Sequence, residues 1–273
     1  MNIPVRDQTH LQYAFEKIVN YMSNNRGPGL SKLSEITQHI FISDLEVSMD
    51  IDTLKSEGIE AILHIGDGEK SKKILNRYKR KKIDHHFVEF EDNPNVDIVP
   101  YFEPCYDYIH KYVSEEKKVL IHCAAGVSRS PTIVAYYMLK RYYLVSFDTS
   151  MKKNKKLINK QEYFVQNILK MIKDNRACIY PNVGFVQQIL LTEYRLKKYF
   201  EGIIRKKYGE GYGKQKPDES SESESEESDL EDKNIDVIVD ETAKKTKKVG
   251  KKDNNGKYDV LEDLRDISPK KNE

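Results

Sequence analysis

Apolar and polar residues alternate along the chain in a way that predicts short buried strands separated by helices. Four runs are short and rich in apolar residues, namely "QHIFIS", "EAILHIG", "IDHHFVEF" and "KKVLIHC". Stretches with helical spacing lie between them, such as "MDIDTLKSEG", "SKKILNRYKRK" and "IVPYFEPCYDYIHKYVSE". This alternation indicates an α/β fold with a central, mostly parallel sheet flanked by helices. The runs at 60–65 and 118–122 are almost continuously apolar, as expected of central strands covered on both faces.

The chain becomes helical in pattern after Arg129. Three helices are predicted in "SPTIVAYYMLKRYY", "EYFVQNILKMIKD" and "PNVGFVQQILLTEYRLKKYF", and Pro181 is well placed at the start of the last one. The polar stretch "SFDTSMKKNKKLINKQ", near 147–162, is expected to be an exposed insertion. Its lysines form either a solvated face or a docking surface for a partner.

The N-terminal segment 1–30 is predicted to be an amphipathic helix. Its apolar residues recur at helical spacing, Thr9 and Gln12 have the spacing of a capping box, and "RGPG" ends the pattern. The apolar positions are Leu11, Ala14, Phe15, Ile18, Val19 and Met22. This helix either covers the side of the domain or packs on a second copy in a homodimer.

Composition divides the 273 residues into a folded part and a charged tail. Residues 205–273 carry 16 Lys or Arg against 19 Asp or Glu and few large apolar residues, so this tail is predicted to be disordered. Since the whole chain has a formal charge of +2, the first 204 residues carry +5. One mildly basic domain, 34–202, is expected. It suits a small anionic group, and no nucleic acid partner is expected.

The cysteine pattern and the hydropathy indicate a soluble intracellular protein. Three cysteines, Cys105, Cys123 and Cys178, give neither a paired metal-binding spacing nor an even count for disulfides. The N-terminus lacks an apolar signal core, and no apolar run is long enough for a membrane span. A cytoplasmic location is expected, with a nuclear location as an alternative because of "KKTKKVGKK".

Cys123 lies where a predicted strand ends and a predicted helix begins. A thiol is nucleophilic as the thiolate, which positive potential stabilises. The loop "AAGVSR" can turn its backbone N–H groups toward one point, since Gly126 allows a tight curl and Ala124 and Ala125 are small. Arg129 can clamp two phosphate oxygens, and Ser130 can donate a hydrogen bond to the sulfur when it leaves. Neither an inert core thiol nor a metal ligand explains these neighbours together.

The same residues resemble a known family. "HCAAGVSRS" is similar to the H-C-x5-R-S signature of the cysteine-dependent protein tyrosine phosphatases, and "AGVSRSPTIVAYYM" with the later "PNVGF" resembles their dual-specificity branch. The resemblance covers nearly all of residues 36–200. It implies a protein phosphatase that forms a phosphocysteine intermediate, needs no metal or other cofactor, and binds phosphate through a loop formed by Ala124, Ala125, Gly126, Val127, Ser128 and Arg129.

The resemblance also implies a general acid about thirty residues upstream of the cysteine. Asp92 in "FVEFEDNPNVDI" is the best match, and Glu91 and Asp97 are the alternatives. The acid would protonate the leaving oxygen and then, as a carboxylate, activate water. By the same resemblance, His122 orients the loop and Asn182 supports it from outside.

The expected partners are phosphorylated proteins. Family members that act on phosphoinositides usually carry lysines in the loop, and those that act on RNA ends have a loop ending in R-T; "AAGVSRS" has neither feature. A phospholipid or RNA phosphatase therefore stays a secondary alternative. A module that binds phosphoproteins without turnover is the alternative from another class, and the simultaneous presence of Cys123, Arg129 and Asp92 argues against it.

Overall fold

The computed structural model describes residues 3–29, 31–153 and 163–208. Its centre is a five-stranded sheet with the order β1-β2-β5-β3-β4, in which only the β1–β2 pair is antiparallel. The strands are β1 Ser34–Thr37, β2 Ile40–Ser43, β3 Ile59–Gly66, β4 Asp84–Glu89 and β5 Lys118–His122. The predicted α/β fold with a mostly parallel central sheet is confirmed.

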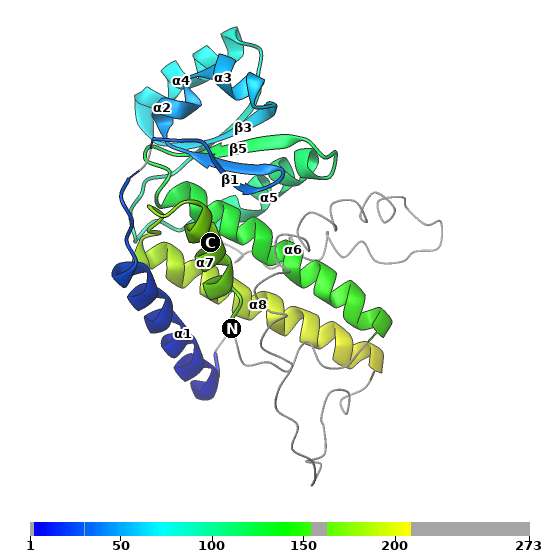
Figure 1. Cartoon of the computed structure of the whole chain (residues 1–273). Coiled ribbons are helices and arrows are strands. Elements are labelled where there is room, and N and C mark those ends of the chain that lie inside the picture. The colour runs from blue at the N-terminus through cyan, green and yellow to red at the C-terminus, as the bar shows by residue number, and fades with distance from the viewer. Residues whose placement is uncertain (1–2, 30, 154–162, 209–273) are drawn as a thin grey trace, which may run out of the picture.

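Helices cover both faces of this sheet (Figure 1). One face carries α2 Leu45–Ser48, α3 Ile51–Ser56 and α4 Gly68–Arg80. The other carries α5 Val99–Val113 and α6 Arg129–Lys153, and behind them lie α7 Val165–Asn175, α8 Val183–Tyr208 and α1 Val5–Asn24. None of the helices in the described ranges is long and apolar enough to cross a membrane.

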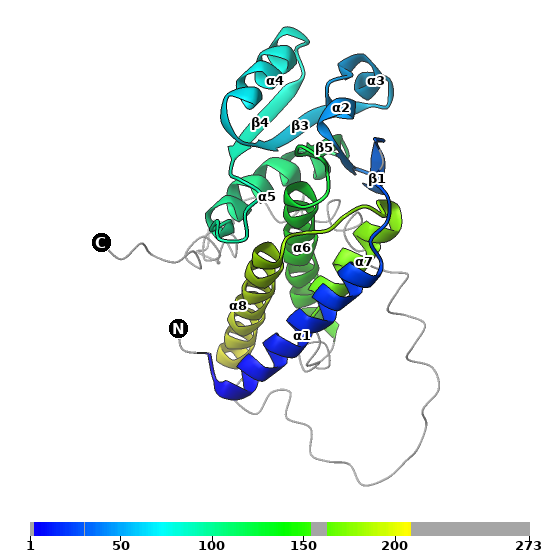
Figure 2. The same cartoon turned by 90° about the vertical axis from the view of Figure 1, so that its left-hand side faces the viewer.

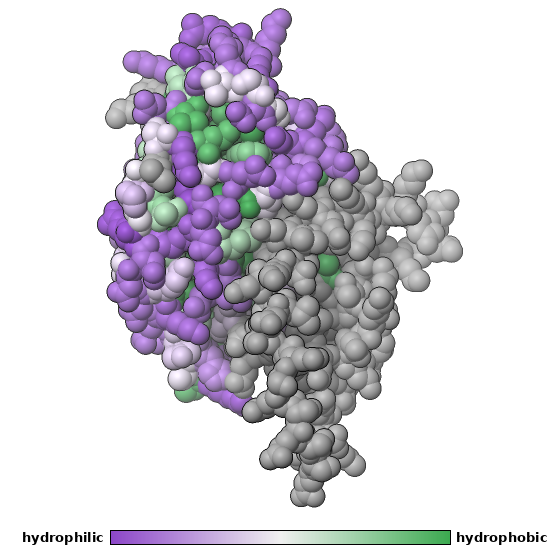
Figure 3. Space-filling model, viewed as in Figure 1, coloured by the Kyte–Doolittle hydropathy of each residue, from purple (hydrophilic) through white to green (hydrophobic). Residues whose placement is uncertain are grey.

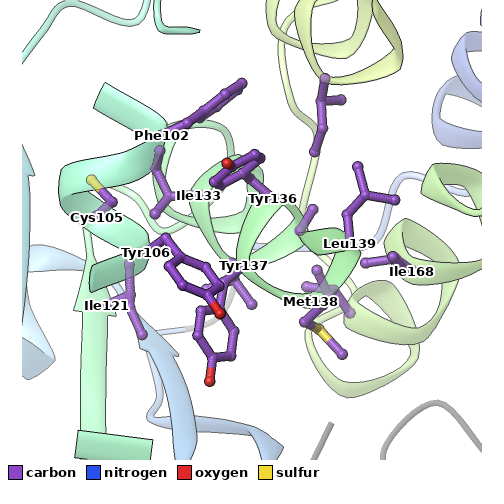
Figure 4. Close-up of a cluster of buried hydrophobic side chains, with 14 of the residues drawn as sticks. Phe102, Cys105, Tyr106, Ile121, Ile133, Tyr136, Tyr137, Met138, Leu139 and Ile168 are labelled. Carbon is purple, nitrogen blue, oxygen red and sulfur yellow. The ribbon is translucent and has the colours of Figure 1, made fainter. Parts of the chain in front are cut away.

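The two faces bury separate apolar clusters. The smaller cluster lies under α3 and α4 and includes Leu54, Ile62 and Leu120. The larger cluster is centred on the first four turns of α6, which are buried on almost every side, as expected of a helix surrounded by α5, α7, α8 and the sheet. Figure 4 shows part of it: Phe102, Cys105 and Tyr106 from α5, Ile121 from β5, Ile133, Tyr136, Tyr137, Met138 and Leu139 from α6, and Ile168 from α7.

The coloured part of the surface in Figure 3 is mostly hydrophilic, and its largest apolar patch lies beside the position of α2 and α3. Partly buried apolar residues do pack against the smaller cluster in this part of the fold, namely Leu33, Leu45, Val47, Met49 and Leu75. The patch therefore continues the core outward at the same face of the sheet that carries α2.

The N-terminal helix begins earlier than its capping-box pattern predicted. α1 starts at Val5, and the Thr9 hydroxyl donates to the Val5 carbonyl 3.2 Å away, one turn back inside the helix. The side chain of Gln12 bonds to Glu16 instead of a backbone amide. The predicted capping box is therefore wrong, because Pro4 precedes the helix and the residues after it continue the same helical turn.

α1 packs on α8 of its own chain (Figure 2). Leu11, Ile18 and Met22, part of its predicted apolar stripe, are buried in this packing. The helix thus covers the side of the domain, which was one of the two alternatives. The homodimer stays a prediction, and the remaining exposed apolar residues of α1, Val5 and Tyr13, lie outside that stripe.

Two further elements differ from the sequence prediction. The strand β1 was not predicted, since it has only four residues and one of them, Glu35, is exposed. The expected insertion near 147–162 is partly helical, because α6 continues to Lys153, and the rest of the insertion lies outside the described residues. The predicted disordered tail also lies outside them, apart from the last residues of α8.

Candidate active site

The carboxyl ends of the four parallel strands meet at one edge of the sheet, and each leads into the candidate site. Cys123 follows β5, Asp67 follows β3, Phe90 and Asp92 follow β4, and Leu45 follows β2. An edge of this kind is where open α/β sheets bind ligands. Cys123 lies at this edge, as the sequence predicted.

The loop between β5 and α6 curls tightly at Gly126. This glycine has a φ of 64°, and a β-carbon at this position would lie 2.5 Å from the carbonyl oxygen of Ser43. Any other residue would be strained by its backbone conformation and would also collide with β2. The loop Cys123–Ser128 therefore depends on glycine at position 126.

The carbonyl groups of the loop are all held by donors from outside it. Leu45 N–H donates to Ala124 O at 3.0 Å, and Tyr180 N–H donates to Val127 O at 2.7 Å. The guanidinium of Arg176 donates to the two carbonyls between them. Its Nη2 donates to Ala125 O at 3.2 Å, and its Nε donates to Gly126 O at 2.9 Å. With its carbonyls fixed on the outer side, the loop can present its N–H groups to the inside, as anion-binding loops do.

Arg176 was not found by sequence reasoning. It is fully buried and also donates from Nη1 to Lys32 O and to Ser34 Oγ. Its position in "DNRACIYPN" shows no periodicity or motif that would distinguish it from the other arginines. Only the fold brings it beneath the loop, 50 residues from Gly126.

The sulfur of Cys123 is buried and accepts two hydrogen bonds. Gly126 N–H lies 3.3 Å from Sγ, and the Ser130 hydroxyl lies 3.4 Å from it. Both donors are placed where a negatively charged sulfur accepts hydrogen bonds. The start of α6 at Arg129 adds the positive end of a helix dipole on the same side.

Arg129 is 6% exposed, and its guanidinium is braced on one side. Nη1 donates to Phe90 O at 3.2 Å and to Asp67 Oδ2 at 3.3 Å. Nε is buried and has no partner among the residues that the structure describes. An unsatisfied buried N–H next to an anion-binding loop is available for a ligand oxygen. Asp67 was missed by sequence reasoning, although it follows a strand just as Cys123 does.

Asp92 is exposed at the rim and is joined to the loop by two donors. Its Oδ1 accepts from Ser128 Oγ and from Asn182 Nδ2, both at 2.7 Å. Asn182 also donates its N–H to Ser128 Oγ at 3.1 Å, and its own Oδ1 accepts from Phe185 N–H at the start of α8. The structure therefore brings Asp92, Ser128 and Asn182 together in one cluster beside the loop.

The loop that carries Asp92 is held against α8. Gln188 accepts from Ile98 N–H and donates to Val96 O, both at 2.8 Å. A β-carbon on Gly184 would lie 1.9 Å from Pro94 O, so the absence of a side chain there permits the contact. The alternative acid Asp97 is engaged elsewhere, since its Oδ1 accepts from Val99 N–H at the start of α5. The other alternative, Glu91, is exposed.

His122 lies fully buried beneath the loop. Its Nδ1 is 3.3 Å from Cys123 O, and its Nε2 is 2.8 Å from the hydroxyl of Tyr78 and 3.1 Å from Nδ1 of His64. Burial, and secondarily the nearby His64, hold the pKa of His122 well below its usual range, so the imidazole is neutral. Within the described residues, no three side chains of His, Cys, Asp or Glu are grouped to hold a metal ion.

The other two cysteines are buried away from these contacts. Cys105 lies in the core on α5 (Figure 4), where burial raises the pKa of its thiol far above its usual range. Cys178 is also buried, in the segment before α8. A thiol that burial keeps protonated packs as a small apolar side chain, which explains Cys105 without a chemical role.

Known proteins share this sequence pattern. The sequence model of the family described as "Dual specificity phosphatase, catalytic domain" matches residues 40–195. Dual specificity protein phosphatase 18 of Rattus norvegicus is 29% identical over 62% of this chain and 71% of its own length. Dual specificity protein phosphatase 1B of Arabidopsis thaliana is 28% identical over 59% of this chain and 81% of its own.

Solved structures also resemble the chain. The human tyrosine phosphatase-like serine/threonine/tyrosine-interacting protein is 22% identical, with a TM-score of 0.47, over 61% of this chain and 98% of that one. DUSP15 is 23% identical, with a TM-score of 0.46, over 63% and 97%.

The family match covers more than half of the chain, so the chain belongs to the dual-specificity phosphatase family. It is a dual-specificity protein phosphatase, and the predicted membership of this branch of the protein tyrosine phosphatases is confirmed. The family as a whole works through a phosphocysteine intermediate. The roles assigned to individual residues stay predictions.

Proposed function

We propose that the chain hydrolyses phosphotyrosine and phosphoserine or phosphothreonine in proteins, with Cys123 as the nucleophile. The observation that carries the proposal is the arrangement around Sγ. Gly126 N–H and Ser130 Oγ point at the sulfur, and the buried Nε of Arg129 lacks a partner among the described residues, so it is available to a phosphate oxygen. Donors placed where negative charge builds in the transition state are the main source of catalysis in phosphoryl transfer.

In the first step the thiolate of Cys123 attacks phosphorus. The S–P bond forms while the bond between phosphorus and the leaving oxygen breaks, and Asp92 gives its proton to that oxygen. The loop N–H groups and Arg129 bind the three equatorial oxygens. Asp92 is suited to this role because it stands at the exposed rim, where a leaving group would depart, while Ser128 and Asn182 fix one of its oxygens and leave the other open.

In the second step Asp92, now a carboxylate, takes a proton from water. The water oxygen bonds to phosphorus and the S–P bond breaks, which returns the sulfur as a thiolate. Ser130 stabilises this leaving sulfur with the hydrogen bond that it already makes at 3.4 Å. Inorganic phosphate is then released from the loop.

Turnover of a small aryl phosphate by the full chain tests the enzyme against the alternative of a binding module. We expect phosphatase activity that vanadate inhibits, no activity in Cys123→Ser, and a strongly lowered kcat with little change in substrate binding in Asp92→Ala. Circular dichroism checks that both variants are folded. Binding of phosphopeptides by the unaltered chain without any turnover would support the binding module instead.

A substrate panel separates the proposed phosphoprotein substrates from the secondary alternatives. Peptides with phosphotyrosine, phosphoserine or phosphothreonine are compared with phosphoinositide vesicles and with 5′-phosphorylated RNA, each at matched phosphate concentration. We expect peptides to give the highest kcat/KM. A higher value for either alternative substrate would contradict the proposal, and a pull-down with Asp92→Ala would then identify bound partners.

We also propose a cytoplasmic location, and the N-terminal helix as the interface if the chain dimerises. Sedimentation of the full chain, compared with Val5→Asp and Tyr13→Glu on the exposed side of α1, tests the interface. Fluorescence microscopy of the tagged full chain tests the location, and accumulation in the nucleus would favour the nuclear alternative.

A further inference from the structure

Two buried histidines lie side by side beneath the active-site loop. His64 on β3 and His122 on β5 are register partners in neighbouring parallel strands, so their side chains point to the same face. Their rings stack at 4.5 Å, and Phe87 on β4, the register partner of His64 on its other side, stacks on it at 5.3 Å. His64 is 3% exposed.

His64 makes a hydrogen bond at each end of its ring. Its Nδ1 lies 3.1 Å from Nε2 of His122, and its Nε2 lies 3.1 Å from Ser71 Oγ at the start of α4. Ser71 Oγ is in turn 3.2 Å from the carbonyl oxygen of Asp67. A β-carbon on Gly66 would lie 2.5 Å from Ser71 Oγ and 2.7 Å from Nε2 of His64, so the contact requires glycine at position 66.

These contacts form a continuous chain between the two ends of the active-site loop. At one end His122 Nδ1 contacts the carbonyl of Cys123 at 3.3 Å, and at the other Asp67 Oδ2 contacts Nη1 of Arg129 at 3.3 Å. We call Asp67, Ser71, His64 and His122 the histidine chain. It joins the backbone of the cysteine to the guanidinium of the arginine through groups that are buried, except for the carboxylate of Asp67.

The proton positions follow from the partners. A carbonyl oxygen only accepts, so Nδ1 of His122 carries a proton, and because the buried ring is neutral its Nε2 is an acceptor. Two groups can donate to this acceptor, Nδ1 of His64 at 3.1 Å and the Tyr78 hydroxyl at 2.8 Å. When Nδ1 of His64 carries the proton, its Nε2 is the acceptor that faces the Ser71 hydroxyl. His64 and Tyr78 together thus favour the tautomer of His122 that turns an N–H toward Cys123.

A histidine that served only to fill space would not need these partners. Burial disfavours a polar ring that stacks on Phe87, and the cost is offset only by hydrogen bonds at both nitrogens. With Nε2 of His122 as an acceptor, the Tyr78 hydroxyl donates to it at 2.8 Å, so His122 keeps a partner when His64 is replaced. The position can thus be altered without leaving an orphaned group beneath the loop.

We propose that His64 is a positioning residue of the phosphatase reaction. Through the histidine chain it keeps Cys123 and Arg129 in their positions relative to each other. The proposal rests on the proposed function for the roles of these two residues. Without His64, the His122 ring loses one of the two donors that face its Nε2, and Ser71 loses the ring nitrogen that aligns it with Asp67. Displacement of catalytic groups by about 1 Å commonly costs about 100-fold in rate.

Three substitutions separate hydrogen bonding from packing. His64→Phe keeps the ring and removes both nitrogens. His64→Asn places an amide near the position of Nδ1, on the side of His122, and His64→Gln places one near the position of Nε2, on the side of Ser71. The matched control is His86→Phe on β4, since the ring of His86 is half-buried and stacks on Tyr108 outside the histidine chain.

For His64→Phe we expect kcat on a small aryl phosphate to fall at least about 10-fold with a smaller change in KM, while His86→Phe stays near the unaltered chain. His64→Asn should recover part of the rate at which iodoacetate alkylates Cys123. His64→Gln should recover part of the affinity for inorganic phosphate, which reports on Arg129. Thermal unfolding identifies any variant that has lost its fold.

Two results would overturn the proposal. One is a His64→Phe variant that equals His86→Phe in kcat, alkylation rate and phosphate affinity. The other is an equal loss in His64→Phe, His64→Asn and His64→Gln, because packing and not hydrogen bonding would then explain the effect. Alkylation and phosphate binding do not require turnover, so a chain without phosphatase activity would contradict the proposed function and still test the histidine chain.

Discussion

Arg176 offers the sharpest test of how the active-site loop is held in shape. Its guanidinium donates to Ala125 O, Gly126 O, Lys32 O and Ser34 Oγ at distances from 2.9 to 3.2 Å, and the side chain is fully buried. Leucine at this position would leave these acceptors without their charged donor. Arg176→Lys would keep the charge but not the planar fork that reaches several carbonyls at once.

The magnitude follows from the number and type of bonds lost. Hydrogen bonds from a charged donor contribute about 1.5–3 kcal/mol each, although their sum overstates the effect since the loop can relax. We therefore expect Arg176→Leu to lower the free energy of unfolding by about 3–5 kcal/mol, because several buried neutral acceptors lose their donor at about 1–3 kcal/mol each and relaxation of the loop recovers part of the loss. Arg176→Lys should lose about half of that, which leaves a folded protein because domains have about 5–15 kcal/mol of stability.

Catalysis should suffer more than stability in Arg176→Lys. If Arg176 turns the loop carbonyls outward, its loss lets them rotate and moves the N–H groups away from Sγ of Cys123, and kcat/KM should fall about 100-fold. Urea denaturation and turnover of a small aryl phosphate measure the two effects. Arg80→Leu on the exposed side of α4 is the matched control. An Arg176→Lys variant with unaltered kcat/KM would refute this account of the loop.

Two further predictions concern the backbone and pH. Gly126→Ala should lower the free energy of unfolding in urea denaturation by more than about 1 kcal/mol and abolish turnover. The reason is that the φ of 64° and the 2.5 Å distance from a β-carbon to Ser43 O exclude a side chain here. An active, stable variant would contradict the strain expected at this position. Burial raises the pKa of Glu193 to about 7 from its unfolded value of 4.5. Because the folded protein holds this proton more tightly than the unfolded chain does, the contribution of Glu193 to stability is greatest below pH 4.5 and is lost as the pH rises through about 7. The unaltered chain should therefore lose up to about 3 kcal/mol relative to Glu193→Gln between about pH 5 and 8, and parallel pH dependences of the two chains would refute it.

The placement of Glu193 also shows why some buried charges escape sequence reasoning. It lies on α8 and accepts from Phe164 N–H and Val165 N–H, the first amides of α7, and from the Tyr143 hydroxyl of α6. In the sequence it is one of many glutamates in a helical stretch. Its function as a cap for another helix depends on how three helices pack, which the periodicity of each helix does not specify.

The strands and the loop were predictable from the sequence for a local reason. A run such as "KKVLIHC" must be buried on both faces, and the residues that surround Sγ of Cys123 follow it within seven positions, so their spacing alone brings them together. Asp92 was also placed at the correct edge of the sheet, since it follows a strand. β1 and the start of α1 were not predicted correctly, because four residues or a single turn carry too little pattern.

The sequence by itself thus determined the α/β architecture, the edge of the sheet that carries the chemistry, and the identity of the loop, because each depends on neighbouring residues. Only the tertiary structure decided what holds the loop in place. Arg176 is 50 residues from Gly126, Asp67 is 62 residues from Arg129, and His64 is 58 residues from His122. Hydrogen bonds between buried groups so far apart in the chain form only after the sheet and its helices have packed, so no local pattern records them.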